Sequence, residues 1–250
     1  MSERAAFPEE SFAQLPEQEG RSFWFRSRNE LIVWALRTYF PQARTFFELG
    51  CGTGVVLAAT AQRCPGLAIS GGELYEAGLE VARRRLPDVQ LHRLDGRRLP
   101  FAEEFDVVGC FDVLEHVDED EQVLAQLRQA TKPGGGVLLS VPQHPRLWSA
   151  VDEFSRHRRR YTSRDLEAKV ERAGFRVVRR TSFVSLLLPV VWLSRVRDRR
   201  TTDYDPATEY RLPRLVDALF GGVMAIERRL IASGLSFPAG SSLLVVARRL

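Results

Sequence analysis

The sequence predicts an α/β fold with a doubly wound, mostly parallel sheet of seven strands. The first observation is that strand and helix patterns alternate between residues 44 and 141. The second is that two further strand patterns, at 175–181 and 242–248, can complete the same sheet. The third is the composition of the 250 residues, 44% apolar and 27% charged, which is typical of a globular protein. This composition excludes collagen-like, low-complexity and disulfide-framework proteins.

Each element is predicted from the period of its apolar residues and from the glycines and prolines at its ends. The expected strands are 44–48, 67–71, 89–94, 105–111, 136–141, 175–181 and 242–248. The expected helices between them are 54–63, 76–86, 119–131 and 163–173. Lys132-Pro133-Gly134-Gly135 is expected to close the third of these helices, and Gly174 to cap the fourth.

Additions to the sheet domain are expected at both ends of this pattern. Residues 1–40 predict an N-terminal lid with a helix that ends before Pro41, and residues 41–182 form the sheet domain. Residues 183–241 are far longer than an ordinary connection, so we expect a helical cap insertion or an oligomer surface there. The final strand lies within 242–250. An apolar stripe at helical spacing supports the cap, made of Leu212, Val216, Leu219, Val223, Ile226 and Leu230.

Charge and cysteine content narrow the function classes. The net charge is +4, but residues 156–200 hold fourteen Lys or Arg against four Asp or Glu. Such a segment fits a nucleic acid, an anionic membrane, an acidic substrate or a solvated face. Cys51, Cys64 and Cys110 lack a CxxC spacing, so we expect neither a zinc site nor disulfides, and a cytoplasmic chain. The acidic N-terminus and the short apolar run at 183–194 predict neither a signal peptide nor a transmembrane helix.

A glycine-rich loop follows the first predicted strand. Its sequence is Glu48-Leu49-Gly50-Cys51-Gly52-Thr53-Gly54. Glycines allow a tight turn and bring backbone N–H groups close to a ligand at a helix N-terminus. The dinucleotide fingerprint fails because Val55 stands at its third glycine, and no Lys-Ser/Thr follows to make a nucleotide P-loop. The loop instead has the pattern E-x-G-x-G-x-G.

This pattern resembles that of the class I S-adenosylmethionine-dependent methyltransferases. The resemblance covers about residues 46–183, including the segments 101–108 and 132–136. It implies a Rossmann-like fold and S-adenosyl-L-methionine as cofactor. The loop around His144 and Arg160 is similar to that of a bacterial small-molecule subgroup (methyltransferase types 11 and 12), often met among genes of cell-envelope glycan or lipid assembly.

The resemblance also implies which residues bind the cofactor. Glu48 and the glycine loop would hold the methionine end, since its ammonium needs a carboxylate and its carboxylate needs N–H groups. Glu73 would accept both ribose hydroxyls, and Asp95 stands where the family has an acid near the adenine amino group. The full set of expected cofactor residues is Glu48, Gly50, Cys51, Gly52, Gly54, Glu73, Leu74, Asp95, Gly96, Phe111 and Asp112.

Two histidines are candidate general bases. A base is needed only if the acceptor must lose a proton, as a hydroxyl does. His116 follows the fourth strand and borders the methyl donor, although its Glu-His pair could equally cap the next helix; His144 follows the fifth strand. Asp112, Glu115 and His116 also resemble the metal cluster of certain quinone and RNA-end methyltransferases, with His144 as the nearby fourth ligand. We expect no metal.

Aromatic and basic residues are candidate acceptor contacts. The candidates are Trp24, Trp148, Arg159, Arg160 and Tyr161. The arginines could hold an anionic acceptor by bidentate contacts or pair with the acidic N-terminus. Trp24 and its neighbours could fold over the cofactor as a lid or pack in the core.

These observations favour a methyltransferase that modifies a small-molecule or lipid- or glycan-linked acceptor at oxygen. The alternatives are an RNA or protein methyltransferase and a non-catalytic cofactor-binding assembly protein. We expect no nucleic-acid partner, because no RNA-binding module is recognised. The apolar run at 183–194, followed by Arg195, Arg197, Arg199 and Arg200, fits peripheral contact with the inner face of a membrane, core packing or a homodimer.

Overall fold

A computed structural model of this chain describes Phe12, residues 15–198 and residues 212–250, with the backbone alone at 196–198. Its strands are β1 (Thr45–Leu49), β2 (Ala68–Glu73), β3 (Gln90–Arg93), β4 (Phe105–Phe111), β5 (Thr131–Pro142), β6 (Phe175–Phe183) and β7 (Ser242–Arg249). They form one sheet in the order β3-β2-β1-β4-β5-β7-β6. β7 is antiparallel to β5 and β6, and the other neighbouring pairs are parallel. The predicted doubly wound, mostly parallel sheet is confirmed.

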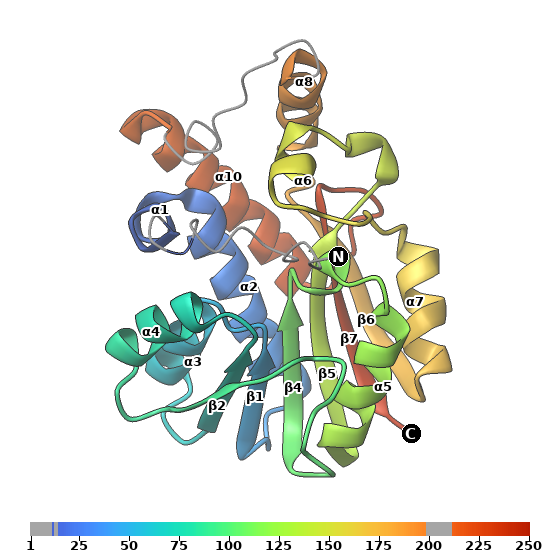
Figure 1. Cartoon of the computed structure of the whole chain (residues 1–250). Helices are drawn as coiled ribbons and strands as arrows, with labels where there is room; N and C mark the ends of the chain where they lie inside the picture. The colour runs from blue at the N-terminus through green and yellow to red at the C-terminus, as the bar shows by residue number, and fades with distance from the viewer. Residues whose placement is uncertain (1–11, 13–14, 199–211) are drawn as a thin grey trace, which may run out of the picture.

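Helices cover both faces of the sheet (Figure 1). They are α1 (Leu15–Arg21), α2 (Phe23–Tyr39), α3 (Val55–Arg63), α4 (Glu76–Arg85), α5 (Asp120–Ala130), α6 (Ala150–Phe154), α7 (Ser163–Arg172), α8 (Leu188–Asp198) and α10 (Arg214–Ala232). Successive strand residues point to opposite faces, so Val107 and Val108 belong to two different apolar cores. The core around Val108 includes side chains of α5 and α7, and the core around Val107 includes side chains of α2, α3 and α10.

The predicted helices and strands of the sheet domain end within two residues of their observed bounds, with one exception. β5 begins at Thr131, so the segment 131–135 is strand where a turn was expected. Thr131 pairs with Phe105, and a shift in register follows before Val107. A Cβ at Gly135 would lie 2.4 Å from the carbonyl oxygen of Asp106, so a glycine lets the two strands approach here. The glycines therefore extend the strand rather than end the helix.

The helix predicted from the apolar stripe is α10. The stripe, however, is not the face of this helix that packs in the core. Met224, Glu227 and Ile231 are its buried residues, whereas Leu219 and Ile226 are exposed. The Glu227 carboxylate accepts the backbone N–H groups of Ser185 (2.8 Å) and Leu186 (2.7 Å). Glu227 thus fixes the chain that leads into α8, and much of the apolar stripe faces outward.

The cap segment leaves and rejoins the sheet at neighbouring positions. β6 and β7 are adjacent, and Phe183 is the cross-strand partner of Ser242. None of the described helices combines the length and apolar character that crossing a membrane requires. Parts of the sequence predictions, the lid residues 1–11 and the arginines at 199 and 200, lie outside the described residues. The division into lid, sheet domain and cap stays a prediction.

Candidate functional site

A cavity of about 680 Å³ opens at the carboxyl ends of the parallel strands. In a doubly wound sheet this edge is where ligands bind, because the strand order reverses there. Every predicted cofactor residue except Gly54 lines this cavity. Gly54 instead begins α3, in a left-handed conformation. The structure therefore brings the predicted cofactor residues together, from segments up to 64 positions apart (Glu48 to Asp112).

The glycine loop needs glycine for its backbone shape. Gly50, Gly52 and Gly54 have φ values of +70°, +53° and +76°, which disfavour other residues. A Cβ at Gly50 would also lie 2.2 Å from a methyl carbon of Val113. The backbone N–H of Gly50 donates to the carbonyl oxygen of Gly72 (2.7 Å), which holds the loop against the end of β2.

The Glu73 carboxylate links this loop to β2. It accepts backbone N–H groups from Gly52 (2.9 Å), Leu74 (2.8 Å) and Tyr75 (3.1 Å). Burial raises the pKa of Glu73, and these three hydrogen bonds oppose that rise. The side chain is thus fixed at the cavity wall, at the position where the resemblance implies a contact with the ribose hydroxyls.

Glu48 lies at the other end of the loop, beside Arg28. The Glu48 side chain is buried, and its Oε2 has no hydrogen-bond partner. Burial raises the pKa of Glu48 well above its usual range, and Arg28 acts against this. Arg28 pairs with Asp112, and its guanidinium lies 4.7 Å from the centre of the Trp24 ring. An unpaired buried carboxylate oxygen fits a cationic group, such as the ammonium of the methionine end of the cofactor.

The N-terminal helices cover one side of the cavity. Glu19 of α1 is buried and accepts hydrogen bonds from the Thr53 hydroxyl in the glycine loop and from Arg85 (2.7 Å) in α4. Phe12 lies against Gly78 and near Gly52. The helix predicted before Pro41 is therefore part of the cavity wall, and its role as a lid stays a prediction.

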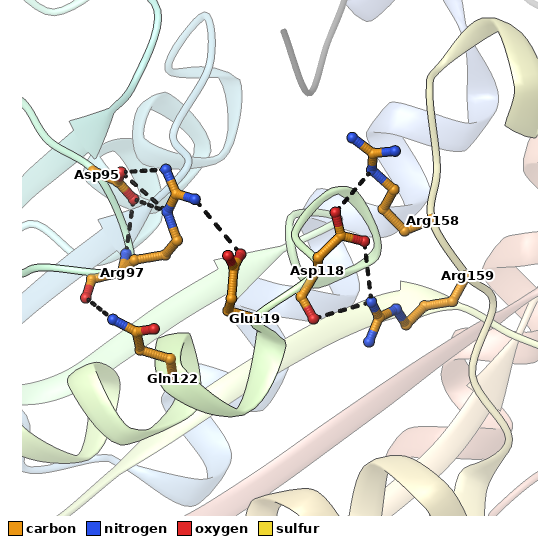
Figure 2. A network of polar contacts seen from close by, with 7 residues as sticks. All are labelled: Asp95, Arg97, Asp118, Glu119, Gln122, Arg158 and Arg159. Carbon is orange, nitrogen blue, oxygen red and sulfur yellow. Dashed lines mark hydrogen bonds and ion pairs between the residues drawn. The ribbon is translucent and has the colours of Figure 1, made fainter. Parts of the chain in front are cut away.

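Asp95, which the resemblance places near the adenine, is held by Arg97. The backbone N–H of Arg97 donates to Asp95 at 2.9 Å, and its Nη2 donates at 2.8 Å (Figure 2). The hydrogen bonds from Arg97 lower the pKa of Asp95. Nη1 of Arg97 also lies 3.5 Å from a carboxylate oxygen of Glu119, so Arg97 links the β3–β4 connection to the start of α5. Asp95 is therefore an oriented, ionised carboxylate on the cavity wall.

A second polar cluster lies in the loops that follow β4 and β5. His116 and His157 both line the cavity, with ring centres 4.7 Å apart. Nδ1 of His157 is 2.8 Å from Oδ1 of Asp152. The sequence indicated His116 as a candidate general base, and it indicated no such role for His157 or Asp152.

Asp152 is a fully buried carboxylate with several donors. It accepts hydrogen bonds from Arg160 Nε (2.7 Å) and from the backbone N–H of Ser149 (2.9 Å), besides its contact with His157. Burial acts to raise its pKa, but the hydrogen bond from His157 and the charge of Arg160 lower the pKa of Asp152 to about 2. The ionised carboxylate favours a proton on Nδ1 of His157 and orients the ring, so that a neutral His157 would carry its lone pair on Nε2.

Several predicted site residues do not reach the cavity. Arg160 and Trp24 line it, but Arg160 is bound to Asp152 and supports that carboxylate. The residues outside the lining are His144, Trp148, Arg159 and Tyr161. Burial and the charge of Arg160 lower the pKa of His144. Nε1 of Trp148 donates to Glu153 at 2.6 Å.

Tyr161 and Arg159 bind Asp120 instead. Tyr161 is fully buried and its hydroxyl donates to Asp120 at 2.6 Å. Arg159 lies 3.1 Å from Asp120 and, in Figure 2, bonds Asp118. Lys169 donates to the same Asp120 carboxylate at 2.5 Å. The structure thus places these two predicted acceptor residues in a buried ionic network. The network joins α5 to the loop after α6 and to α7.

This network predicts a large stability effect. Asp120→Ala leaves the Lys169 ammonium without its carboxylate and removes the shorter hydrogen bond of the Tyr161 hydroxyl, so we expect the free energy of unfolding to fall by about 3 kcal/mol. Glu121→Ala, which removes only an exposed ion pair with Arg172, is the matched control and should leave the urea midpoint nearly unchanged. Equal losses in the two variants would contradict this role for Asp120.

Among the described residues, one group of side chains could share a metal ion. Ligand atoms of Glu115, His116 and His157 all lie within 4.8 Å of one another. Asp112 and His144, the other members of the set that the resemblance raised, do not belong to this group. Burial and the nearby Asp112 raise the pKa of Glu115 well above its usual range, which favours a protonated carboxyl group over a metal ligand. The expectation of no metal stays a prediction.

Comparison with known sequences identifies the family. A family model described as a methyltransferase domain matches residues 19–180. The ubiquinone biosynthesis O-methyltransferase of Azoarcus sp. (strain BH72) is 37% identical over 99 residues, which are 37% of this chain and 42% of that protein. The dTDP-4-amino-2,3,4,6-tetradeoxy-D-glucose N,N-dimethyltransferase of Saccharopolyspora spinosa is 32% identical over 108 residues, 42% of this chain and 43% of that protein. The chain thus aligns with less than half the length of these relatives.

Solved structures extend the similarity in fold to nearly the whole chain. A complex between the Haloferax volcanii Trm112 methyltransferase activator and a methyltransferase matches with a TM-score of 0.63 and 18% identity, over 96% of this chain and 94% of that chain. Phosphoethanolamine N-methyltransferase 2 of Haemonchus contortus matches with a TM-score of 0.60 and 19% identity, over 89% and 52%. Because the family model spans more than half of the sequence, the chain belongs to the class I S-adenosylmethionine-dependent methyltransferases.

Proposed function

We propose that the protein transfers the methyl group of S-adenosylmethionine to a hydroxyl oxygen of a small-molecule acceptor, with His157 as the general base. The observation that carries this proposal is that His157, which lines the cavity, is paired with the buried, ionised Asp152 behind it. An oriented imidazole is needed for a hydroxyl acceptor, which must lose a proton, and not for an amine that reacts through its free lone pair.

The charged groups around His157 support the transfer of a proton from the acceptor hydroxyl to this residue. S-Adenosylmethionine, when bound, supplies an activated methyl group on a sulfonium. The acceptor hydroxyl gives its proton to Nε2 of His157 while its oxygen bonds the methyl carbon, and the electron pair of the broken carbon–sulfur bond stays on sulfur. The imidazolium formed at His157 is stabilised by Asp152 at 2.8 Å, and Arg160 keeps that carboxylate ionised.

The shape and lining of the cavity support a small acceptor. Its volume, about 680 Å³, is that of a small-molecule site. Apolar side chains such as Phe23, Val151 and Val184 line it together with the cations of Arg158 and Arg195. The relatives named above are an O-methyltransferase of ubiquinone biosynthesis and an N,N-dimethyltransferase of a sugar nucleotide, which also supports a small molecule.

A labelling experiment tests the proposal. The protein is incubated with S-adenosylmethionine carrying a labelled methyl group and an extract of its source organism, and the labelled product is identified by mass spectrometry. Gly52→Arg, whose side chain obstructs the cofactor loop, is the control. We expect a small-molecule methyl ether that forms equally well with EDTA present. A methylamine product would overturn the oxygen assignment, and label in RNA or protein would overturn the small-molecule assignment. Loss of activity with EDTA would assign a metal to Glu115, His116 and His157.

The buried Glu48 predicts that cofactor binding depends on pH. The raised pKa makes Glu48 easier to protonate in the free protein, and an ammonium beside it favours the carboxylate, so binding releases a proton wherever free Glu48 holds one. We therefore expect S-adenosylhomocysteine to bind about tenfold more tightly at about pH 8 than at about pH 5.5. Calorimetry in two buffers of different ionisation enthalpy measures the proton release. Glu48→Gln should bind more weakly and lose the pH dependence; equal wild-type affinities at both pH values would contradict the prediction.

A further inference from the structure

The cavity is closed on the side of the glycine loop. Cys51 and Thr53 of this loop are 4% and 2% exposed, and Glu73 is 7% exposed. A Cβ at Gly78 would lie 3.0 Å from the Phe12 ring and 3.3 Å from Cγ of Glu73, so Phe12 lies beside the Glu73 side chain. For a cofactor to reach these residues, the segment that covers them must move.

The helix α1 belongs to this covering segment. Leu15 and Glu19 of α1 line the cavity, and Figure 1 shows the helix above α4, at the edge of the molecule. A helix is usually held to its domain by an apolar stripe, but within α1 the one buried residue is Glu19. Seven residues are too few for a helix to be stable alone, so α1 depends on its attachments. A segment with so little buried apolar surface opens at a low cost in free energy.

Glu19 supplies the polar attachment of α1. Its carboxylate accepts hydrogen bonds from the Thr53 hydroxyl and, at 2.7 Å, from Nη2 of Arg85 in α4. Nη1 of Arg85 also donates to the carbonyl oxygen (2.9 Å) and the hydroxyl (3.0 Å) of Thr53. Glu17, the other acidic residue of α1, forms an exposed ion pair with Arg21 of the same helix. Glu19 therefore ties α1 to the glycine loop and to α4, and Glu17 does not.

We propose that α1 is a gate over the cofactor site and that the contacts among Glu19, Thr53 and Arg85 hold this gate closed. The gate opens when Glu19 leaves Thr53 and Arg85 and α1 turns about Ser22, the single non-helical residue between α1 and α2. The contacts of Glu19 thus set the rates at which S-adenosylmethionine enters and S-adenosylhomocysteine leaves. The gate acts on the cofactor alone, so it does not depend on the acceptor or on the role of His157.

The kinetics of cofactor binding test the gate. Surface plasmon resonance, with the full chain immobilised and S-adenosylhomocysteine as the analyte, measures the association and dissociation rate constants. Glu19→Gln keeps the size of the side chain and removes its charge. We expect both rate constants to rise by about tenfold or more, because a buried charge-assisted contact no longer opposes opening. The dissociation constant should change less than either rate constant, since the gate opens for entry and for exit. In the matched control Glu17→Gln, both rate constants should stay within about twofold of the wild type.

A second variant and a second measurement identify the contact. Arg85→Met removes the partner of Glu19, and the double variant Glu19→Gln/Arg85→Met should be no faster than the faster single variant, because the two side chains form one contact. Hydrogen exchange of the free protein should be faster in α1 and in the glycine loop of Glu19→Gln than in the wild type. Equal protection of β4 and β5 in all the proteins would show that the variants are folded.

Three results would overturn the proposal. The first is a rise in the dissociation rate constant of Glu19→Gln with an unchanged association rate constant, which would make Glu19 a direct contact of the cofactor. The second is a pair of unchanged rate constants in Glu19→Gln, which would show that the cofactor enters by another route. The third is unchanged hydrogen exchange of α1 in Glu19→Gln, which would show that other residues hold the helix.

Discussion

Glu73→Ala is expected to raise the dissociation constant of S-adenosylhomocysteine by about 100-fold or more. The loss has two parts, because Glu73 both shapes the site and is the residue that we expect to bind the ribose. Its carboxylate accepts the backbone N–H groups of Gly52, Leu74 and Tyr75, so its removal frees the glycine loop from the end of β2. It also removes the acceptor for a vicinal diol, and a hydrogen bond to a charged group contributes about 1.5–3 kcal/mol.

Calorimetry with S-adenosylhomocysteine measures this effect. Glu76→Gln is the matched control, because Glu76 follows three residues later and makes only an exposed ion pair with Arg83. We expect its affinity to stay within about twofold of the wild type. Glu73→Gln separates the two parts of the loss, since it keeps the size of the side chain and removes the charge. An affinity of Glu73→Ala near that of the wild type would show that the ribose is held by other residues.

His157→Gln is expected to lower kcat by about 100-fold to 10,000-fold with little change in KM for S-adenosylmethionine. The glutamine is close in size to histidine and can still donate to Asp152, so the fold of the loop is retained while the proton acceptor is lost. Steady-state kinetics with the acceptor identified by labelling measures both quantities.

His116→Gln is the control for this prediction. His116 lies beside His157, and the carboxyl group near its ring is that of Glu115, whose raised pKa favours the neutral form, so we expect a loss below about tenfold. A larger loss in His116→Gln than in His157→Gln would return the role of base to the histidine that the sequence first indicated. Unchanged kcat in both variants would show that the acceptor needs no base.

The fold was predictable because its signals are local. The spacing of apolar residues in β1 to β4 and in α3 to α5 is set by the two faces of a buried sheet, so it is visible in sequence. The glycine loop was equally clear, because the positive φ values at Gly50, Gly52 and Gly54 leave few other residues possible. Ten of the residues predicted at the cofactor site line the cavity for this reason.

The acceptor side was less predictable because it depends on contacts between distant segments. His157 approaches His116 only when the loop after β5 folds back on the loop after β4. A buried acid five residues before a histidine, as Asp152 is before His157, was the one local signal available. Tyr161 shows the reverse case. An aromatic residue after four basic or ionisable residues resembles a binding residue, but the Tyr161 hydroxyl donates to Asp120 and to the carbonyl oxygen of Leu114.

The cap segment begins and ends at neighbouring positions of the sheet, which affects how freely its length can vary. Since Phe183 and Ser242 are cross-strand partners, the β6–β7 pairing already closes the loop that the cap forms. Each doubling of such a loop adds only about 0.6 kcal/mol of closure entropy, so its length is nearly free to vary. The residues around the glycine loop and Glu73 lie elsewhere along the chain. The segment 184–241 can therefore change in length without rearranging the strands that carry the glycine loop and Glu73.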